Sequence, residues 1–407
     1  MKKIVYFLFI VVASLVGACD EEPVGQTPTN SSVPPSVAEP KVENIAGGAI
    51  VYYTLPKGET DISYVRAEYM YKGNIKSNKS SVYKNFVRIE GFANTDPVEV
   101  KLYTVNHSEV ESKPLSVIIN PLTPPVFNIT ASFKMQPDFG GVKVNWENET
   151  GDEMVLTLMT YDEEVKRYME KDALYSSSKN GEFSFRGLES KATRFGLCVR
   201  DKYFNISDTV TFEMTPLYET VIKTDHFARV MDIPLDDLTA LPGWGFEKMW
   251  DGVAIGDAVG WHSGQERFPR NFFTWDLGSI IKLSRFTLWH RTNVPYGNNN
   301  VKFFELWGAT DYDKNNKDEA FWEHEGGWET DGHWEYLGTF EVKKPSGDGP
   351  EITNEDREAC NNGFEFLIPL ETKPVRYLRF GQISNWSGGN GIHIAEIRYW
   401  GDDTIQQ

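Results

Sequence analysis

The chain has 407 residues, which is enough for two to four domains that each bury their own core. Its 59 acidic residues outnumber its 41 basic ones, and the formal net charge of −18 disfavours nucleic acid and anionic membrane surfaces as partners, because both attract cations. The 40% hydrophobic and 14% aromatic content indicates a folded protein, and the acidity suits an extracytoplasmic space.

The first 18 residues have the layout of a secretory signal peptide. Two lysines precede an apolar run from Ile4 to Val16 that is too short to span a bilayer comfortably. The run ends in "LVGAC", which resembles a bacterial lipobox. This resemblance implies cleavage before Cys19 and acylation of its thiol, so that the acyl chains hold the protein on a membrane. The alternative is an ordinary signal peptide with an unrelated cysteine.

The residues that follow Cys19 bear on the location of the protein. "DEEP" resembles the export signal that carries lipoproteins to the cell surface in polysaccharide-using Gram-negative gut bacteria. In other Gram-negative groups, an Asp at this place resembles an inner-membrane retention signal instead. We expect the outer membrane and the cell surface, with a periplasm-facing lipoprotein as the alternative. Residues 19–40 also contain a stretch rich in Pro, Ser and Thr, which predicts a flexible tether.

Two segments after the tether look like copies of each other. "GGAIVYYTLP" at 47–56 is answered by "GGVKVNWENE" at 140–149, about 93 residues later, and each copy ends in a strand that leads into "PL". This period of short strands is the size of an immunoglobulin-like sandwich. The pattern resembles tandem fibronectin type III domains in surface lipoproteins of glycan-utilisation systems. It predicts two such domains, 41–122 and 123–217, that act as spacers.

The composition changes after Tyr218, because eleven of the twelve tryptophans lie between Trp244 and Trp400. We expect a connecting segment at 218–244, within which 223–238 has a mixed pattern that could form a helix. From Asn271 onward, alternating strand candidates with little helix between them predict a β-sandwich. Within these strands, we expect four tryptophans to face the core: Trp275, Trp289, Trp307 and Trp400.

Several motifs at 245–407 occur in the order of the discoidin, or coagulation-factor type C, domain. They include "MWDGVAIGDAVGWHS" from Met249, "FFTWDLGSIIKLSRFTLWHR" from Phe272, and "GIHIAEIRYWG" near the C-terminus. The region therefore resembles the galactose-binding fold that family 32 carbohydrate-binding modules share, which implies a jelly roll. The predicted fold class is all-β, with two immunoglobulin/fibronectin III-like sandwiches followed by a discoidin-like jelly-roll sandwich.

Loops at one end of a jelly roll gather residues that are far apart in the sequence. A pyranose has an apolar face that packs on an aromatic ring, and hydroxyl groups that need planar donors and acceptors. The resemblance places Arg291 and Trp386 at the sugar-contacting positions of the family, although Trp386 could instead cap the sandwich. The expected ligand-binding residues are Trp261, His262, Arg291, Asn298, Trp386 and Asn390.

The same family often holds a structural calcium ion between its "DG" loop and the Glu of "AE". By position, the resemblance implies Asp251, Asp257 and Glu396 as ligands, which offer the hard oxygens that calcium needs. The loop at 249–263 is longer than usual, and a threonine or serine ligand of the family has no obvious equivalent. A hydrogen-bonded loop without metal is the alternative, and no other cofactor is expected.

Three classes of function remain. The first is a non-catalytic cell-surface lipoprotein that binds glycan through its C-terminal domain. The second is a structural subunit that docks on other proteins of a surface glycan-uptake complex. The third, a glycosidase, needs paired carboxylates across a sugar cleft, and no segment is left for a separate catalytic domain. We therefore expect a glycan-binding protein that is not an enzyme.

Overall fold

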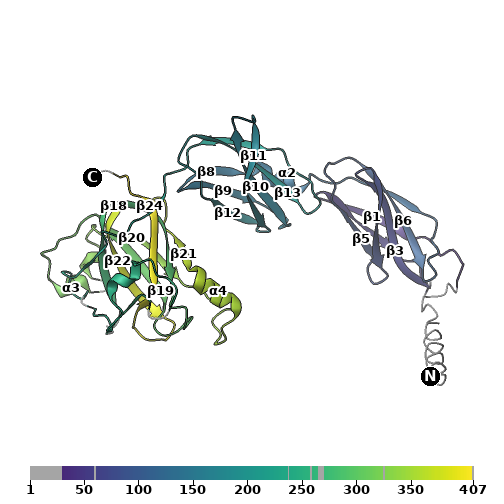
Figure 1. Ribbon diagram of the computed structural model, residues 1–407. Helices are drawn as coiled ribbons and strands as arrows, with labels where there is room; N and C mark the ends of the chain where they lie inside the picture. Colours follow the sequence, from purple (N-terminus) through teal and green to yellow (C-terminus); the bar gives the residue numbers. More distant parts are fainter. Residues whose placement is uncertain are drawn as a thin grey trace, which may run out of the picture. The chain divides into compact units, whose positions relative to one another are not determined.

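The computed structural model describes residues 30–58, 61–236, 238–256, 259–264, 270–323 and 326–405. About 49% of the residues lie in strands and 8% in helices, which confirms the all-β fold class. Figure 1 shows three strand-rich parts in chain order: β1 to β7, β8 to β14, and β15 to β24.

The first part is a sandwich of two antiparallel sheets, ordered β1-β2-β5 and β4-β3-β6-β7. Fully buried Val51, Val65 and Leu102 come from both sheets and belong to one apolar core. Alternate residues of β2 are buried, as a strand that packs on one face requires. The strands are β1 (Ala38–Ile45), β2 (Gly48–Thr54), β3 (Ile62–Tyr71), β4 (Asn74–Ser81), β5 (Phe86–Glu90), β6 (Val98–Asn106) and β7 (Leu115–Ile119).

The second part repeats this strand arrangement, with sheets ordered β12-β9-β8 and β11-β10-β13-β14. A short helix, α2 (Pro125–Ala131), precedes it. The strands are β8 (Lys134–Asp138), β9 (Gly141–Glu147), β10 (Met154–Asp162), β11 (Arg167–Ser176), β12 (Asn180–Phe185), β13 (Thr193–Asp201) and β14 (Val210–Met214).

The Gly-Gly pairs of the two repeats have the same structural role. Gly47 and Gly140 have φ of 63° and 62°, which glycine adopts without strain. Their amides donate to the carbonyls of Leu122 and Leu217, each at 2.9 Å. The next residue in each copy, Gly48 or Gly141, lies so close to the neighbouring strand that a Cβ would clash with a backbone carbonyl. The repeated motif therefore closes the same turn twice.

The third part depends on one long strand, β18 (Phe272–Trp289). Its first half pairs with β22 (Val375–Asn385), and its second half pairs with β24 (Glu396–Asp402). The register with β22 shifts between Asp276 and Ile281, where Gly278 has φ of 82°, and pairing with β24 begins at Lys282. The remaining paired strands are β15 (Thr220–Val221), β16 (Ala228–Val230), β19 (Val301–Ala309), β20 (Glu335–Glu341) and β21 (Phe364–Leu367).

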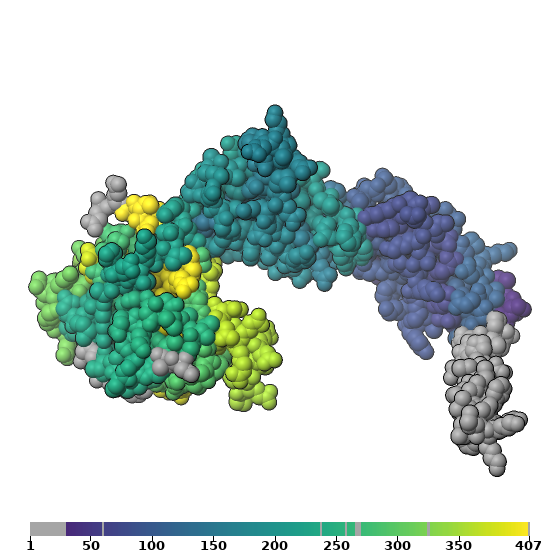
Figure 2. All heavy atoms as spheres, viewed as in Figure 1, coloured from purple at the N-terminus to yellow at the C-terminus, as the bar shows by residue number. Residues whose placement is uncertain are grey.

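The connecting segment expected at 218–244 contributes to this third part. β15 pairs with β24, and β16 pairs with the start of β18. The mixed pattern at 223–238 therefore forms a short strand, and no helix occurs among its described residues. The short elements of this part are η1 (Phe246–Trp250), β17 (Trp261–His262), α3 (Glu319–Trp322), η2 (Gly327–Glu329), α4 (Asn354–Asn362) and β23 (His393–Ile394). The yellow-green atoms around α4 project from the surface in Figure 2.

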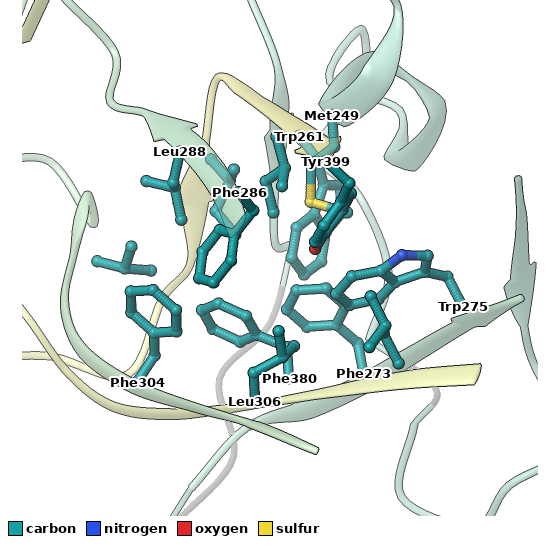
Figure 3. Packing of buried hydrophobic residues seen from close by; sticks show 14 of the residues in the cluster. Met249, Trp261, Phe273, Trp275, Phe286, Leu288, Phe304, Leu306, Phe380 and Tyr399 are labelled. Carbon is teal, nitrogen blue, oxygen red and sulfur yellow. The ribbon is translucent and has the colours of Figure 1, made fainter. Parts of the chain in front are cut away.

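A row of aromatic rings forms the centre of the third part. Phe304 stacks on Phe380 at 4.7 Å between ring centres, Phe380 on Phe273 at 4.8 Å, and Phe273 on Trp275 at 5.4 Å (Figure 3). These rings come from β19, β22 and β18, so the stack joins three strands. Burial of such side chains is worth about 1.5–3 kcal/mol each.

The tryptophans of the strands divide between the core and the outer face. Trp275 and Trp289 are buried, as predicted. Trp307 is half-buried and packs against a second core cluster of this part, which fits the prediction. Trp400 is half-buried and belongs to no core cluster of the described residues, so the prediction that it faces the core is wrong. Trp400 stacks under the guanidinium of Arg285, whose Cζ lies 4.1 Å from the ring centre. The period-2 pattern could not show this, because both faces of these strands carry aromatic residues.

Candidate functional site

Loops that are distant in sequence meet at one end of the C-terminal sandwich. The backbone amide of Arg291 donates to Asn300 Oδ1 at 3.0 Å. The amide of Trp386 donates to the carbonyl of Asn300 at 2.9 Å, and that of His393 donates to the carbonyl of Asn299 at 2.8 Å. These bonds bring together the residues that follow β18 and β22 and those that precede β19 and β24. This arrangement agrees with the prediction from the jelly roll.

Asn300 holds the loop between β18 and β19 from inside. It is fully buried, and its Nδ2 donates to the carbonyl of Val294 at 2.9 Å. Three residues of this loop have positive φ: Tyr296, Asn298 and Asn299. Asparagine tolerates this conformation better than most residues, whereas a bulky residue such as Tyr296 adopts it at a cost. The loop is thus fixed by its own hydrogen bonds in a specific, partly strained shape.

Four side chains form a polar and aromatic group at this end, which we call the Trp244 cluster: Trp244, His262, Arg291 and Asn299. The Arg291 guanidinium lies 5.0 Å from the centre of the half-buried Trp244 ring, and its Nε donates to Asn293 Oδ1 at 2.7 Å. The His262 ring meets the Trp244 ring edge-on, with 6.3 Å between centres. Asn299 Nδ2 lies 3.4 Å from His262 Nε2.

Backbone pairing brings the Trp244 cluster together. The amide of Leu241 donates to the carbonyl of His262 at 3.0 Å, and the amide of His262 approaches the carbonyl of Trp244 at 3.4 Å. His262 in turn pairs with His393 of β23. The His262 Nδ1 donates to the carbonyl of Ser263 at 2.9 Å, which leaves Nε2 as an acceptor for the amide of Asn299.

Two further histidines lie beneath this surface and are fully buried. Burial lowers the pKa of His393 to about 4 and that of His290 to about 3. Each ring donates its Nε2–H to a carbonyl, His393 to Val259 at 3.0 Å and His290 to Val301 at 2.8 Å. Both rings are therefore neutral at physiological pH and support the loops rather than transfer protons.

The structure places the other predicted ligand-binding residues differently. Trp261 is fully buried, with its ring 4.8 Å from that of Phe273 and 5.0 Å from that of Phe246. The prediction that Trp261 binds ligand is therefore wrong, because alternate residues of β17 face opposite sides and only His262 reaches the surface. Asn298 is exposed in its loop, and the half-buried Asn390 accepts a hydrogen bond from the Asn271 side chain at its carbonyl.

Trp386 packs against the C-terminal core and is half-buried. Its ring meets that of Tyr296 edge-on at 5.0 Å, and the ammonium of Lys302 lies 4.3 Å from its ring centre. Its indole nitrogen is buried. These contacts fit the alternative that this ring caps the sandwich, because it packs against the core cluster and its indole nitrogen is buried.

Trp244 is the residue that sequence reasoning missed. It fell in the segment expected to connect the domains, and its place beside Arg291 depends on the pairing of the 240–244 segment with β17. One signal was present in the sequence. "PGWGF" puts Trp244 between two glycines, and "NWSGGNG" likewise puts Trp386 in a glycine-rich stretch.

Of the predicted metal ligands, Glu396 is buried and hydrogen-bonded in the fold. Glu396 is 2% exposed, and its Oε2 accepts from the amide of Gly252 at 3.2 Å. Burial, followed by the nearby charge of Asp251, raises the pKa of Glu396 to about 7. Asp257 lies outside the described residues. Among the described residues, no group of three or more His, Cys, Asp or Glu side chains could hold a metal ion.

Three segments of the chain match protein families. Residues 34–121 match "Domain of unknown function (DUF4959)", residues 122–225 match "Domain of unknown function (DUF5126)", and residues 250–401 match "Domain of unknown function", DUF5000. No curated protein matches the sequence.

Similar solved structures include three kinds of protein. "SusE-like protein BT2857" is 24% identical, covers 69% of this chain and 99% of its own, and has a TM-score of 0.42. A CBM32-3 domain from a family 31 glycoside hydrolase of Clostridium perfringens is 15% identical, covers 45% and 95%, and has a TM-score of 0.31. A two-domain fibronectin type III segment of chicken tenascin is 10% identical, covers 44% and 99%, and has a TM-score of 0.21. All three are less than 25% identical to this chain and have TM-scores below 0.5, so the proposed function rests on the geometry of the site.

The pKa of Glu396 gives a testable dependence of stability on pH. Because this pKa is raised from 4.5 to about 7, the folded state holds the proton more tightly than the unfolded state. The contribution to stability is therefore complete below about pH 4.5 and is lost as the pH rises to about 7. Glu396→Gln removes this dependence. The melting temperature of the variant minus that of the wild type, both measured in chelator, should therefore increase from pH 5 to pH 8. A constant difference would contradict the raised pKa.

Proposed function

We propose that this protein is a non-catalytic glycan-binding lipoprotein of the bacterial cell surface, which holds saccharide at the Trp244 cluster of its C-terminal sandwich. The observation that carries the proposal is the packing of Arg291 against the half-buried ring of Trp244 at the loop end. An indole supplies an apolar face for the C–H groups of a pyranose. The guanidinium beside it supplies hydrogen-bond donors for the hydroxyl groups.

The rest of the cluster supports this chemistry. The guanidinium has five N–H donors, and Asn293 accepts from Nε alone at 2.7 Å. His262 and Asn299 add two planar side chains that hold each other through the contact between Asn299 Nδ2 and His262 Nε2, and the Asn299 amide can both donate and accept. None of the cluster's four described side chains is a carboxylate, whereas glycosidases commonly use two. Its composition therefore favours recognition over bond cleavage.

The binding loops need little rearrangement in this proposal. Asn300 is buried and bonded on both sides, and Asn299 accepts from Asn385 Nδ2 at 3.1 Å. Trp386 acts as a cap that fixes Tyr296 and the loop between β18 and β19, and it does not stack on sugar. A rigid loop loses less entropy on binding than a mobile one. We expect weak but rapid binding, with a Kd on the order of 0.1–1 mM.

Substitutions in the cluster test the site. Trp244→Ala and Arg291→Ala should each weaken glycan binding about tenfold, because each removes roughly 1–2 kcal/mol of stacking or hydrogen bonding. Trp386→Ala should instead lower the melting temperature while the remaining folded protein keeps its affinity. The measurements are calorimetric titration with a glycan found by array screening, and thermal unfolding of each variant.

The matched control is Trp400→Ala, which removes another half-buried tryptophan outside the cluster. Unchanged affinity in Trp244→Ala and Arg291→Ala would reject this site. If the wild type binds no glycan and crosslinking on cells captures a partner protein that Trp244→Ala loses, the surface serves protein docking, because tryptophan and arginine also dominate protein interfaces.

The lipid anchor is the second component of the proposal. Cys19 lies outside the described residues, and among those residues no helix is long and apolar enough to span a bilayer. Cys19→Ala should therefore move the protein from the membrane fraction to the soluble fraction, as measured by cell fractionation. Cys19→Ser is the conservative control and should behave in the same way. Membrane association of both variants would contradict lipidation, and protection of the wild type from external protease would place it in the periplasm.

We also propose that the buried Glu396 helps to bind a calcium ion. Its carboxylate, near Asp251, would help to hold the ion together with Asp257, and calcium would neutralise a charge that the fold otherwise buries at a cost. At pH 8, calcium should raise the melting temperature of the wild type but not that of Glu396→Gln, because only the folded wild type would bind it. An equal response of both proteins, or no response, would remove calcium from the proposal.

A further inference from the structure

The second repeat carries exposed apolar side chains that its fold does not require. Tyr175 is 76% exposed, Phe204 is 71% exposed and Ile206 is 60% exposed. Val155 of β10 pairs with Tyr175 of β11 and with Arg200 of β13, and Arg200 bridges to Ile206. Residues opposite each other in neighbouring strands point to the same face of a sheet. Tyr175, Val155, Arg200 and Ile206 therefore form one row across the sheet, and Phe204 lies in the turn between Arg200 and Ile206.

A groove of about 600 Å³ runs along part of this row. Its lining includes both exposed rings, Tyr175 and Phe204. The Arg200 guanidinium lies 5.0 Å from the centre of the Phe204 ring. Within the described part of the chain, this guanidinium has no hydrogen bond or ion pair, so its donors remain available to a ligand.

The first repeat provides an internal comparison. Its corresponding row runs from Ser81 through Tyr64 and Val105 to Glu111. Tyr175 and Ile206 of the second repeat thus correspond to the polar residues Ser81 and Glu111 of the first. Both rows have the same antiparallel pairing, so the sheet itself does not call for exposed apolar side chains.

The turn after this row is also the same in both repeats. The amide of Glu109 donates to the carbonyl of Asn106 at 3.1 Å, and the amide of Phe204 donates to the carbonyl of Asp201 at 3.1 Å. Glu109 and Phe204 both have positive φ, at 60° and 62°. The turn therefore accepts a charged residue in the first repeat. An exposed phenylalanine in this conformation gains little from folding, which points to a role in binding.

The chemistry of the groove indicates the class of ligand. Its charged lining residues are two acids, Glu153 and Asp201, and two bases, Arg200 and Lys202, so it favours an uncharged ligand. Aromatic rings beside hydrogen-bonding groups suit the faces and hydroxyls of sugars. Ten residues line the groove, whereas a stable protein interface takes about 20–30 residues on each side. A small, neutral, polar ligand therefore fits better than a protein.

We propose that the second repeat carries its own binding site for a neutral saccharide, formed by Tyr175, Phe204 and Arg200. This site goes beyond the proposed function, because it does not use the Trp244 cluster or the C-terminal sandwich. A chain with two sites gains avidity for a polysaccharide when both sites engage it at once.

The test is native affinity electrophoresis of the full-length protein in gels that contain amylopectin, xylan, galactomannan, galactan or mixed-linkage β-glucan. Mobility is compared with a gel that lacks polysaccharide. In the Arg291→Ala background, which weakens the C-terminal site, retardation by one of these polymers should persist. Adding Tyr175→Ser and Phe204→Glu should then raise the apparent Kd at least about tenfold. The introduced serine and glutamate are the residues that the first repeat has at the corresponding positions, Ser81 and Glu109, so the turn and sheet should still form.

Tyr83→Ser is the matched control, because Tyr83 is 95% exposed and lies outside the groove. It should leave retardation unchanged. Equal retardation of the groove variants and the control would overturn the proposal, as would the absence of retardation by all five polymers in the Arg291→Ala background. Sedimentation would show whether the wild type self-associates and whether the groove variants lose this self-association. If they do, and no polymer retards the wild type in gels, this face is a protein interface and the saccharide site is overturned. Retardation that depends only on Arg291 would leave the proposed function standing and reject this one.

Discussion

The C-terminal site depends on a single strand that belongs to two pairings. β18 pairs with β22 through its first half and with β24 through its second half, and Gly278 lies in the irregular stretch just before the change. Its inward rings, Phe273, Trp275 and Phe286, pack in the core, and its last residues lead directly to His290 and Arg291. The position of the Arg291 guanidinium is therefore set by the same strand that holds the core together.

The loop end combines a rigid interior with a polar surface. His290 and His393 are buried as neutral rings, and Asn300 is buried with its amide fully engaged. Burying polar groups is costly unless they are hydrogen-bonded, so the bonds made by Asn300 and by Nε2 of each histidine help to fix the loops in one arrangement. Above them, His262, Arg291 and Trp244 remain accessible enough to meet a ligand. This division between support and contact is what a weak, rapid saccharide site needs.

The all-β class and the tandem repeat could be predicted because each follows from a local pattern, whereas the gathering of the C-terminal loops was expected from the resemblance to the discoidin domain. Strand alternation and the two Gly-Gly pairs are visible in the residues themselves. The site was predicted less well. Trp261 and His262 are neighbours in one strand, and only their pairing with β23 shows which of them is buried. Trp244 lies in the site because the segment before it pairs with His262, and this long-range pairing cannot be seen in the local sequence.

NMR of the indole and guanidinium N–H groups can show directly whether saccharide contacts Trp244 and Arg291. A saccharide titration should shift the Trp244 indole and Arg291 Nε–H signals together, with one common Kd. The buried Trp261 and Trp275 indoles should shift far less, and the Trp386 signal should change only slightly. Saturable shifts at Trp386 without shifts at Trp244 and Arg291 would contradict the account and make Trp386 the stacking residue.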